Sequence, residues 1–350
     1  MRWLPLVAIA SACGGGGSSK PAPTTPTTEA KVDSHTAEKD AKGLVTEIYN
    51  SLNHADTDGL LTLLSDRVTV FGPRKADALG RSDALVELRK QVDPKAKKKA
   101  QVMSAGLEVV PSAGGHSAWV FDVIQLGASE PIAITAVLSN ADDLWLVTAA
   151  AIAKKPPMKL VRAELKKDAV VPNAMAAPAK IDSAAEGAVE RFKKGLLDQQ
   201  VWGDDLGSRS DAVVIGPGKG DVTKGKNDIK TMWKKRLKAG VREVATGEIS
   251  AGATPDGQLA WVSAPVNRAE TDDDMLPLRA FAVFEKSDSG WKMIALHESV
   301  ALDAPGAGAA LKKIAPPAPA KPEEEKKPDK KPDDSKKKKK KSRPRPADDN

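Results

Sequence analysis

The chain repeats itself: five landmarks recur in the same order in its two halves, at offsets between 142 and 146 residues. The pairs are Tyr49 and Phe192, Gly72 and Gly216, Gly80 and Gly225, Trp119 and Trp261, and Trp145 and Trp291. Self-similarity at a fixed spacing indicates a repeated structural unit. The 350 residues are enough for two domains of ordinary size with tails. The sequence therefore predicts tandem domains at residues 35–153 and 181–304.

Each copy shows the same succession of patterns. An amphipathic helix is expected at 36–54 and 183–201, then a short strand that ends at a Gly-Pro, then a second helix at 82–91 and 227–237. Alternating or apolar runs then predict strands at 101–110, 118–126, 132–139 and 144–152, and at 242–250, 259–267, 278–285 and 291–302. Helices first and strands afterwards indicate an α+β fold with antiparallel sheets.

The closing stretch of the second copy, GWKMIALHESV at 290–300, alternates in character after a turn. It resembles the last strand of SnoaL-like domains, which belong to the nuclear transport factor two superfamily. The resemblance covers residues 37–153 and 182–304. It implies two cone-shaped domains, each a curved sheet wrapped around its N-terminal helices with a pocket inside, as in ketosteroid isomerase and scytalone dehydratase.

Enzymes of this family use an Asp or His base together with Tyr, Asp or His donors inside the cone. Here His297 is the best candidate, because strict alternation places it on the same strand face as Trp291 and Met293. These three residues are our candidates for a ligand pocket in domain 2. A core histidine bonded to neighbouring groups is the competing interpretation. The first copy has Ala151 at the corresponding position.

No catalytic pair is predicted from the repeat. Tyr49 is replaced by Phe192 in the second copy, and Asp122 by Ala264. We therefore expect non-catalytic binding of a small apolar ligand or of a protein partner. The alternative is an isomerase-like or cyclase-like enzyme that uses the pocket of domain 2. The four histidines are scattered without metal-ligand spacing, and GPGKGD at 216–221 lacks the phosphate-loop pattern, so no metal or cofactor is predicted.

The amino terminus, MRWLPLVAIASAC, has one basic residue, a short apolar run and then small residues before Cys13. This is typical of a secretory signal, and ASAC resembles the bacterial lipobox, which implies lipidation of Cys13. The only cysteine of the chain lies there. Residues 1–13 are thus expected to be a lipoprotein signal peptide and 14–34 a flexible tether. The protein would be anchored to a bacterial membrane in the cell envelope, with the outer membrane as the favoured site.

Two further segments are predicted to lie outside the domains. Residues 154–180 carry several prolines and are expected to form a linker, with two helical turns possible at 160–167. Residues 305–350 form a Lys/Pro-rich tail that is expected to be disordered. From residue 321 on, thirteen Lys and Arg face eight Asp and Glu, so most of the net +7 lies there. The tail either contacts anionic envelope polymers or is a solvated extension, and nucleic acid is not an expected partner.

Overall fold

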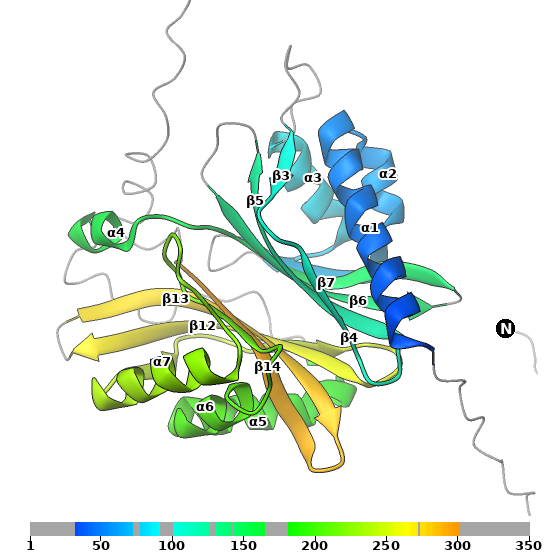
Figure 1. The fold of residues 1–350 in the computed structure, drawn as a ribbon. Helices are drawn as coiled ribbons and strands as arrows, with labels where there is room; N and C mark the ends of the chain where they lie inside the picture. The colour runs from blue at the N-terminus through cyan, green and yellow to red at the C-terminus, as the bar shows by residue number, and fades with distance from the viewer. Residues whose placement is uncertain are drawn as a thin grey trace, which may run out of the picture.

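A computed structural model describes residues 32–72, 78–91, 101–126, 131–141, 143–164, 181–271 and 274–300. Cys13, the tether, the tail and residues 165–180 of the predicted linker lie outside these described residues. Two sheets of seven strands each lie between two groups of helices (Figure 1). The protein is thus α+β with two sheet-containing domains, as predicted. We refer to described residues 32–154 as domain 1 and 181–300 as domain 2.

Domain 1 begins with helices and ends with strands. Its elements are α1 (Ser34–His54), α2 (Thr57–Thr62), β1 (Leu64–Phe71), β2 (Ala78–Leu79), α3 (Arg81–Gln91), β3 (Val102–Ser104), β4 (Glu108–Pro111), β5 (Ser117–Leu126), β6 (Ile132–Ala141) and β7 (Leu144–Lys154). The strands lie in the order β2-β1-β7-β6-β5-β3, and β4 also pairs with β5. All pairings are antiparallel except that of β1 with β7, so the sheet is mixed and not wholly antiparallel as expected.

Domain 2 repeats this order after α4 (Met158–Glu164). Its elements are η1 (Ser183–Ala185), α5 (Glu186–Leu197), α6 (Gln200–Leu206), β8 (Val213–Ile215), β9 (Val222–Lys224), α7 (Lys226–Lys238), β10 (Arg242–Ala245), β11 (Ser250–Ala253), β12 (Leu259–Thr271), β13 (Asp274–Ser287) and β14 (Gly290–Val300). Its sheet order is β10-β12-β13-β14-β8-β9, with β11 on β12. As in domain 1, the one parallel pairing among its named strands joins the first strand to the last one.

Local chemistry explains where the first helix of each domain begins and ends. Asp33 caps α1 by accepting a hydrogen bond from the Thr36 amide at 3.1 Å. Ala55 ends the helix in the left-handed conformation, with φ of 55°. In domain 2 the predicted helix 183–201 is divided, because Asp198 adopts an extended conformation and α6 starts two residues later.

Two predicted strands are interrupted. The segment 101–110 forms β3 and β4, and 242–250 forms β10 and the start of β11. Both pieces pair with the same long neighbouring strand in each domain, with a break around Gly106 in one and Gly247 in the other. The long strand loses a few pairings opposite the break but stays continuously paired on its other side, with β6 or β13. The break lets each sheet curve around its helices.

The last strand of each domain contains a β-bulge. In β14, Val283 pairs with Ala295 but Phe284 pairs with Met293, so Ile294 is an extra residue. Domain 1 has the same shift, with Thr148 as the extra residue of β7. A bulge reverses which face the later side chains occupy. The strict alternation expected along 290–300 is therefore wrong beyond Met293.

The outer faces of the two sheets pack against each other, with the helices on the far sides (Figure 1). This interface forms a continuous apolar cluster that includes Phe71 and Trp119 of domain 1 with Trp261 and Phe281 of domain 2. The ring centroids of Phe71 and Trp261 are 5.4 Å apart. Ion pairing of Lys224 with Glu108 adds a polar link between the domains, and Lys155, directly after β7, donates to the Gly216 carbonyl of domain 2.

Candidate functional site

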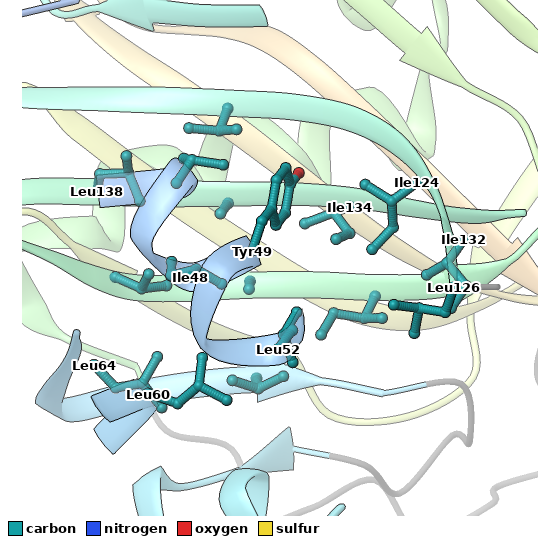
Figure 2. A pocket seen from close by; sticks show the side chains of 17 residues that line it. Ile48, Tyr49, Leu52, Leu60, Leu64, Ile124, Leu126, Ile132, Ile134 and Leu138 are labelled. Atoms are coloured by element: carbon teal, nitrogen blue, oxygen red, sulfur yellow. The ribbon is translucent and has the colours of Figure 1, made fainter. Parts of the chain in front are cut away.

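The inside of the first cone contains an apolar cavity of about 110 Å³. Helices α1 and α2 close one side of it, and β1, β5, β6 and β7 form the curved wall (Figure 2). Among the residues that line it, only Tyr49 has a polar side-chain atom. The others are Val45, Ile48, Leu52, Leu60, Leu64, Val70, Val120, Ile124, Leu126, Ile132, Ile134, Ala136, Leu138, Val147, Ala150 and Ile152.

The volume of three side chains explains why this cone is hollow. The sheet registers make the two domains equivalent position by position: Ala136 pairs with Ala150 in one, and Ala282 with Leu296 in the other. Alanine at 150 thus corresponds to a leucine in domain 2. By the same registers, Leu138 corresponds to Phe284 and Val147 to Met293. Domain 1 has the smaller side chain at all three positions.

Aromatic residues fill the interior of domain 2. Phe192, Trp202 and Trp233 enter it from α5, α6 and α7, and each is almost completely buried. The Phe192 and Trp202 rings lie 5.0 Å apart. Two helical glycines make room for the indoles, because a Cβ on Gly195 would lie 1.7 Å from Trp202 Nε1 and one on Gly203 would lie 2.3 Å from Trp233 Cδ1. The described interior of this cone is therefore packed.

A buried ionic network replaces part of the apolar lining in domain 2. Glu298 and Arg268 occupy the positions of Ile152 and Leu126. Glu298 Oε2 accepts from Arg236 at 2.7 Å and its other oxygen pairs with Arg268, which also donates to Glu243 at 3.1 Å. Burial raises the pKa of Glu243 to about 7, and the charge of Glu298 adds to this shift. Burial also acts to raise the pKa of Glu298, but the two arginines outweigh it and hold that pKa far below its ordinary value.

The polar group of the domain 1 cavity belongs to a hydrogen-bonded pair. Tyr49, on α1, donates to Asp122 Oδ2 on β5 at 2.8 Å. Asp122 is completely buried between Val120 and Ile124 on the strand face that lines the cavity. Burial, followed by the charge of Asp122, raises the pKa of Tyr49 well above its usual value, so the phenol stays protonated. The two copies of the repeat differ at both residues, but the sequence pattern did not predict that Tyr49 and Asp122 contact each other.

His297 lies on the other face of its sheet from the one expected. Because of the bulge at Ile294, it points into the interface between the two sheets, and its Nδ1 is 3.1 Å from Thr135 Oγ1 of domain 1. Burial first, and then the charge of Lys155, lowers the pKa of His297 to about 3. The prediction that His297 shares a face with Trp291 and Met293 is wrong, and His297 does not reach the interior of either cone.

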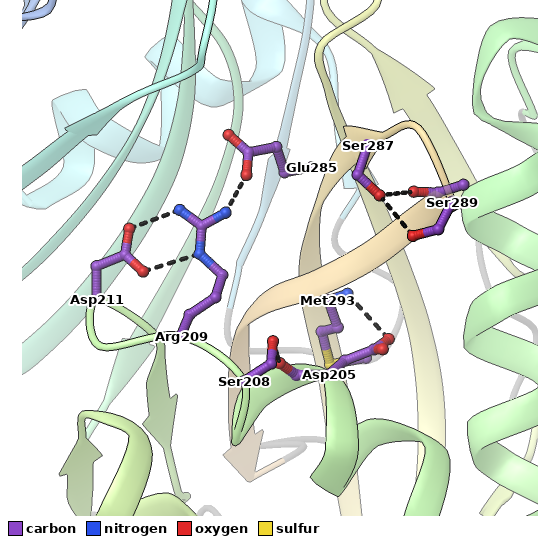
Figure 3. Close-up of polar contacts among 9 residues, drawn as sticks. Asp205, Ser208, Arg209, Asp211, Glu285, Ser287, Ser289 and Met293 are labelled. Atoms are coloured by element: carbon purple, nitrogen blue, oxygen red, sulfur yellow. Dashed lines mark hydrogen bonds and ion pairs between the residues drawn. The ribbon is translucent and has the colours of Figure 1, made fainter.

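The other two candidates lie within domain 2 but apart from any interior cavity. Met293 is fully buried in the packed core, and its amide donates to Asp205 at 3.1 Å (Figure 3). Asp205 is held in turn by Arg191, at 2.9 Å from Nε. Trp291 is half-buried and rests on α5 at Gly187. Nearby, Arg209 pairs with Asp211 and with Glu285 of β13 (Figure 3). These ion pairs connect the segment before β8 to the hairpin of β13 and β14.

Within the described part of the chain, no three His, Cys, Asp or Glu side chains gather in a way that could hold a metal ion. The described helices also include none that is both long and apolar enough to cross a membrane.

Comparison with known proteins gives one family match. The SnoaL-like domain family matches residues 200–303, which lie within domain 2 and the segment that follows it. No curated protein matches the chain. Similar solved structures include two NTF2-like proteins of unknown function. One from Pseudomonas putida is 16% identical over 35% of this chain and 89% of its own, with a TM-score of 0.30. One from Shewanella baltica is 14% identical over 36% of this chain and 99% of its own, also with a TM-score of 0.30.

Proposed function

We propose that this protein is an envelope lipoprotein with two SnoaL-like domains, of which the first binds a small apolar molecule inside its cone. The observation that carries the binding proposal is the cavity of domain 1, about 110 Å³ in volume and lined almost wholly by aliphatic side chains. An apolar cavity of roughly 150 Å³ is known to take up benzene. The domain 1 cavity is smaller, at about 110 Å³, so we propose a ligand no larger than a single six-membered ring or a short branched chain.

The two halves of the proposal rest on different support. The family match within domain 2 and the same element order in domain 1 favour two related domains. Lipid anchoring at Cys13 is supported by the sequence alone, since Cys13 lies outside the described residues. Contact of the tail with anionic envelope polymers likewise stays a prediction.

Domain 2 has a structural role in this proposal. Its interior is packed with Phe192, Trp202 and Trp233, and its sheet forms half of the interface with domain 1. An isomerase-like or cyclase-like reaction within domain 2 would need room for a substrate, and its described interior offers none at the predicted residues. We therefore propose binding in domain 1 without a catalytic role for domain 2.

The test fills the cavity. Ala150→Leu places the side chain that domain 2 already has at this position into the space. Calorimetric titration with benzene, cyclohexane and toluene should show binding to the wild-type protein and at least a tenfold loss, on the order of 1.4 kcal/mol, in Ala150→Leu. Ala163→Leu adds the same atoms to the exposed surface of α4 and should bind like wild type. Absence of binding to the wild type, or equal binding to Ala150→Leu, would contradict the proposal.

A further inference from the structure

A carboxyl group that domain 2 lacks lies on the strand face that lines the domain 1 cavity, bonded to the lining residue Tyr49. Asp122 is completely buried, and its neighbours on the same strand face, Val120 and Ile124, both line the cavity. The register gives Ala264 at the corresponding place in β12. A buried carboxyl group beside an aliphatic cavity costs stability unless its oxygens are paired. Its presence in only one of the two cones points to a role in what that cone holds.

The hydrogen bonds of the pair determine what the cavity can offer to a ligand. Tyr49 has a single hydroxyl proton, and it donates that proton to Asp122 Oδ2 at 2.8 Å. The second carboxyl oxygen, Oδ1, is buried and has no hydrogen-bond partner among the described residues. The free capacity of the pair thus consists of lone pairs, on Asp122 Oδ1 and on the Tyr49 oxygen. A carboxylate accepts hydrogen bonds and does not donate them.

We propose that the molecule bound in domain 1 carries a hydroxyl or amino group, which donates a hydrogen bond to Asp122 Oδ1. This inference rests on the proposed function of the same cavity. The apolar body of the ligand contacts the aliphatic wall, and its one donor satisfies the buried carboxyl oxygen. A ketone or an ether of the same size brings only an acceptor, which would face the lone pairs of the pair. The ligand class is therefore a small apolar alcohol, phenol or amine.

Three probes of nearly equal size separate donor from acceptor chemistry. Cyclohexanol donates, cyclohexanone only accepts, and methylcyclohexane does neither. Hydrogen bonds to charged groups are worth enough to change affinity by about tenfold or more. In calorimetric titration of the whole protein we expect cyclohexanol to bind at least about tenfold more tightly than cyclohexanone. Cyclohexylamine, tested beside cyclohexanol, shows whether a neutral or a cationic donor is preferred.

The variant Asp122→Asn reverses the chemistry without changing the size. Its amide oxygen can accept from Tyr49, and its NH₂ group can donate to a ligand carbonyl. Cyclohexanone should then bind as well as cyclohexanol, or better. Should this variant fold poorly, the wild-type preference for cyclohexanol over cyclohexanone decides alone.

The possible failures are distinguishable. If none of the probes binds the wild-type protein, the proposed function itself fails, and the inference fails with it. If the probes bind, and Ala150→Leu abolishes that binding, but cyclohexanone equals or exceeds both donor probes, the cavity binds apolar molecules and the donor inference is overturned.

Discussion

At the scale of single residues, the two cones differ most sharply at two positions: Tyr49 and Asp122 of domain 1 correspond to Phe192 and Ala264 of domain 2. In domain 1 the phenol donates to one oxygen of the carboxyl group, and the other oxygen is buried without a partner among the described residues. In domain 2 both polar groups are replaced by apolar ones, and neither position needs a partner. The two copies thus show that these equivalent positions can hold either a polar pair or an apolar pair. Domain 2 therefore supplies the apolar reference for variants of domain 1.

We predict that Tyr49→Phe lowers the free energy of unfolding by about 1–3 kcal/mol, because Asp122 then stays buried with neither oxygen paired. The double variant Tyr49→Phe, Asp122→Ala copies domain 2 and should recover part of that loss. Urea unfolding of the two single variants and the double variant gives the coupling energy. Strictly additive losses would show that the pair does not act as a unit.

A second prediction concerns His297, which the fold holds neutral in the interface. Its pKa of about 3 lies below the ordinary value near 6.5. Between these two pH values the imidazole is protonated in the unfolded chain but stays neutral in the folded protein. The stability it contributes is complete above pH 6.5 and is lost as the pH falls towards 3. When the pH falls from 7 to 4, the free energy of unfolding of His297→Leu should therefore decrease by about 1–3 kcal/mol less than that of the wild type.

Urea unfolding at the two pH values measures this difference. Lys155 and Glu298, the charged groups that act on His297, are present in both proteins, so their own titration largely cancels. Parallel losses in wild type and variant would mean that His297 is not held neutral by the fold.

At the scale of elements, the helices and long strands could be predicted because their periodicity is local. The helix predicted at 36–54 is α1, and the strand predicted at 118–126 is β5 apart from one residue. The face of His297 could not be predicted, because the extra residue Ile294 leaves no mark in the alternation of apolar and polar residues. Pairing of Tyr49 with Asp122 depends on how α1 lies in the sheet, which periodicity does not give. The hollow cone left a signal: the offset of 146 that pairs Trp145 with Trp291 also pairs Ala150 with Leu296.

Helix α5 gives a prediction with a matched control in α1. Gly195→Ala would place a Cβ against the indole of Trp202, and we expect a loss of about 1–3 kcal/mol from overpacking. Gly43 lies in the first helix of domain 1, is exposed and has no atom within 4 Å of the added Cβ. Gly43→Ala should stabilise by roughly 0.5–1 kcal/mol through helix propensity. Thermal melts should shift in opposite directions, and a neutral Gly195→Ala would contradict the packed interior.

At the scale of the whole molecule, the two sheets form one apolar interface, and the helices face outward. Trp119, Trp261 and Phe281 are buried there, and the hydrogen bond from Ser117 to Asp256, at 2.8 Å, also joins the domains. The outer face of each sheet is therefore buried against the other domain. The cavity of domain 1 lies on the helix side of its own sheet, and no side chain of domain 2 lines it.

The membrane prediction belongs to this scale because it concerns a terminus outside both domains. Acylation contributes about 0.8 kcal/mol per buried methylene, so a multiply acylated Cys13 should hold the protein in a membrane. Cys13→Ala should abolish partitioning into the detergent phase of a phase-separation assay. Mass spectrometry of the mature amino terminus is the accompanying check. Unchanged partitioning, with no lipid on that terminus, would refute the anchor.

The central claim is that the first cone is hollow and the second is filled, and xenon tests it most directly. Apolar cavities of this size take up xenon. Diffraction from crystals pressurised with xenon should show a bound atom in domain 1 between Tyr49, Val147 and Ala150, and none among Phe192, Trp202 and Trp233. Loss of the peak in Ala150→Leu would complete the result. An empty first cone, or xenon bound equally in the second, would contradict the account.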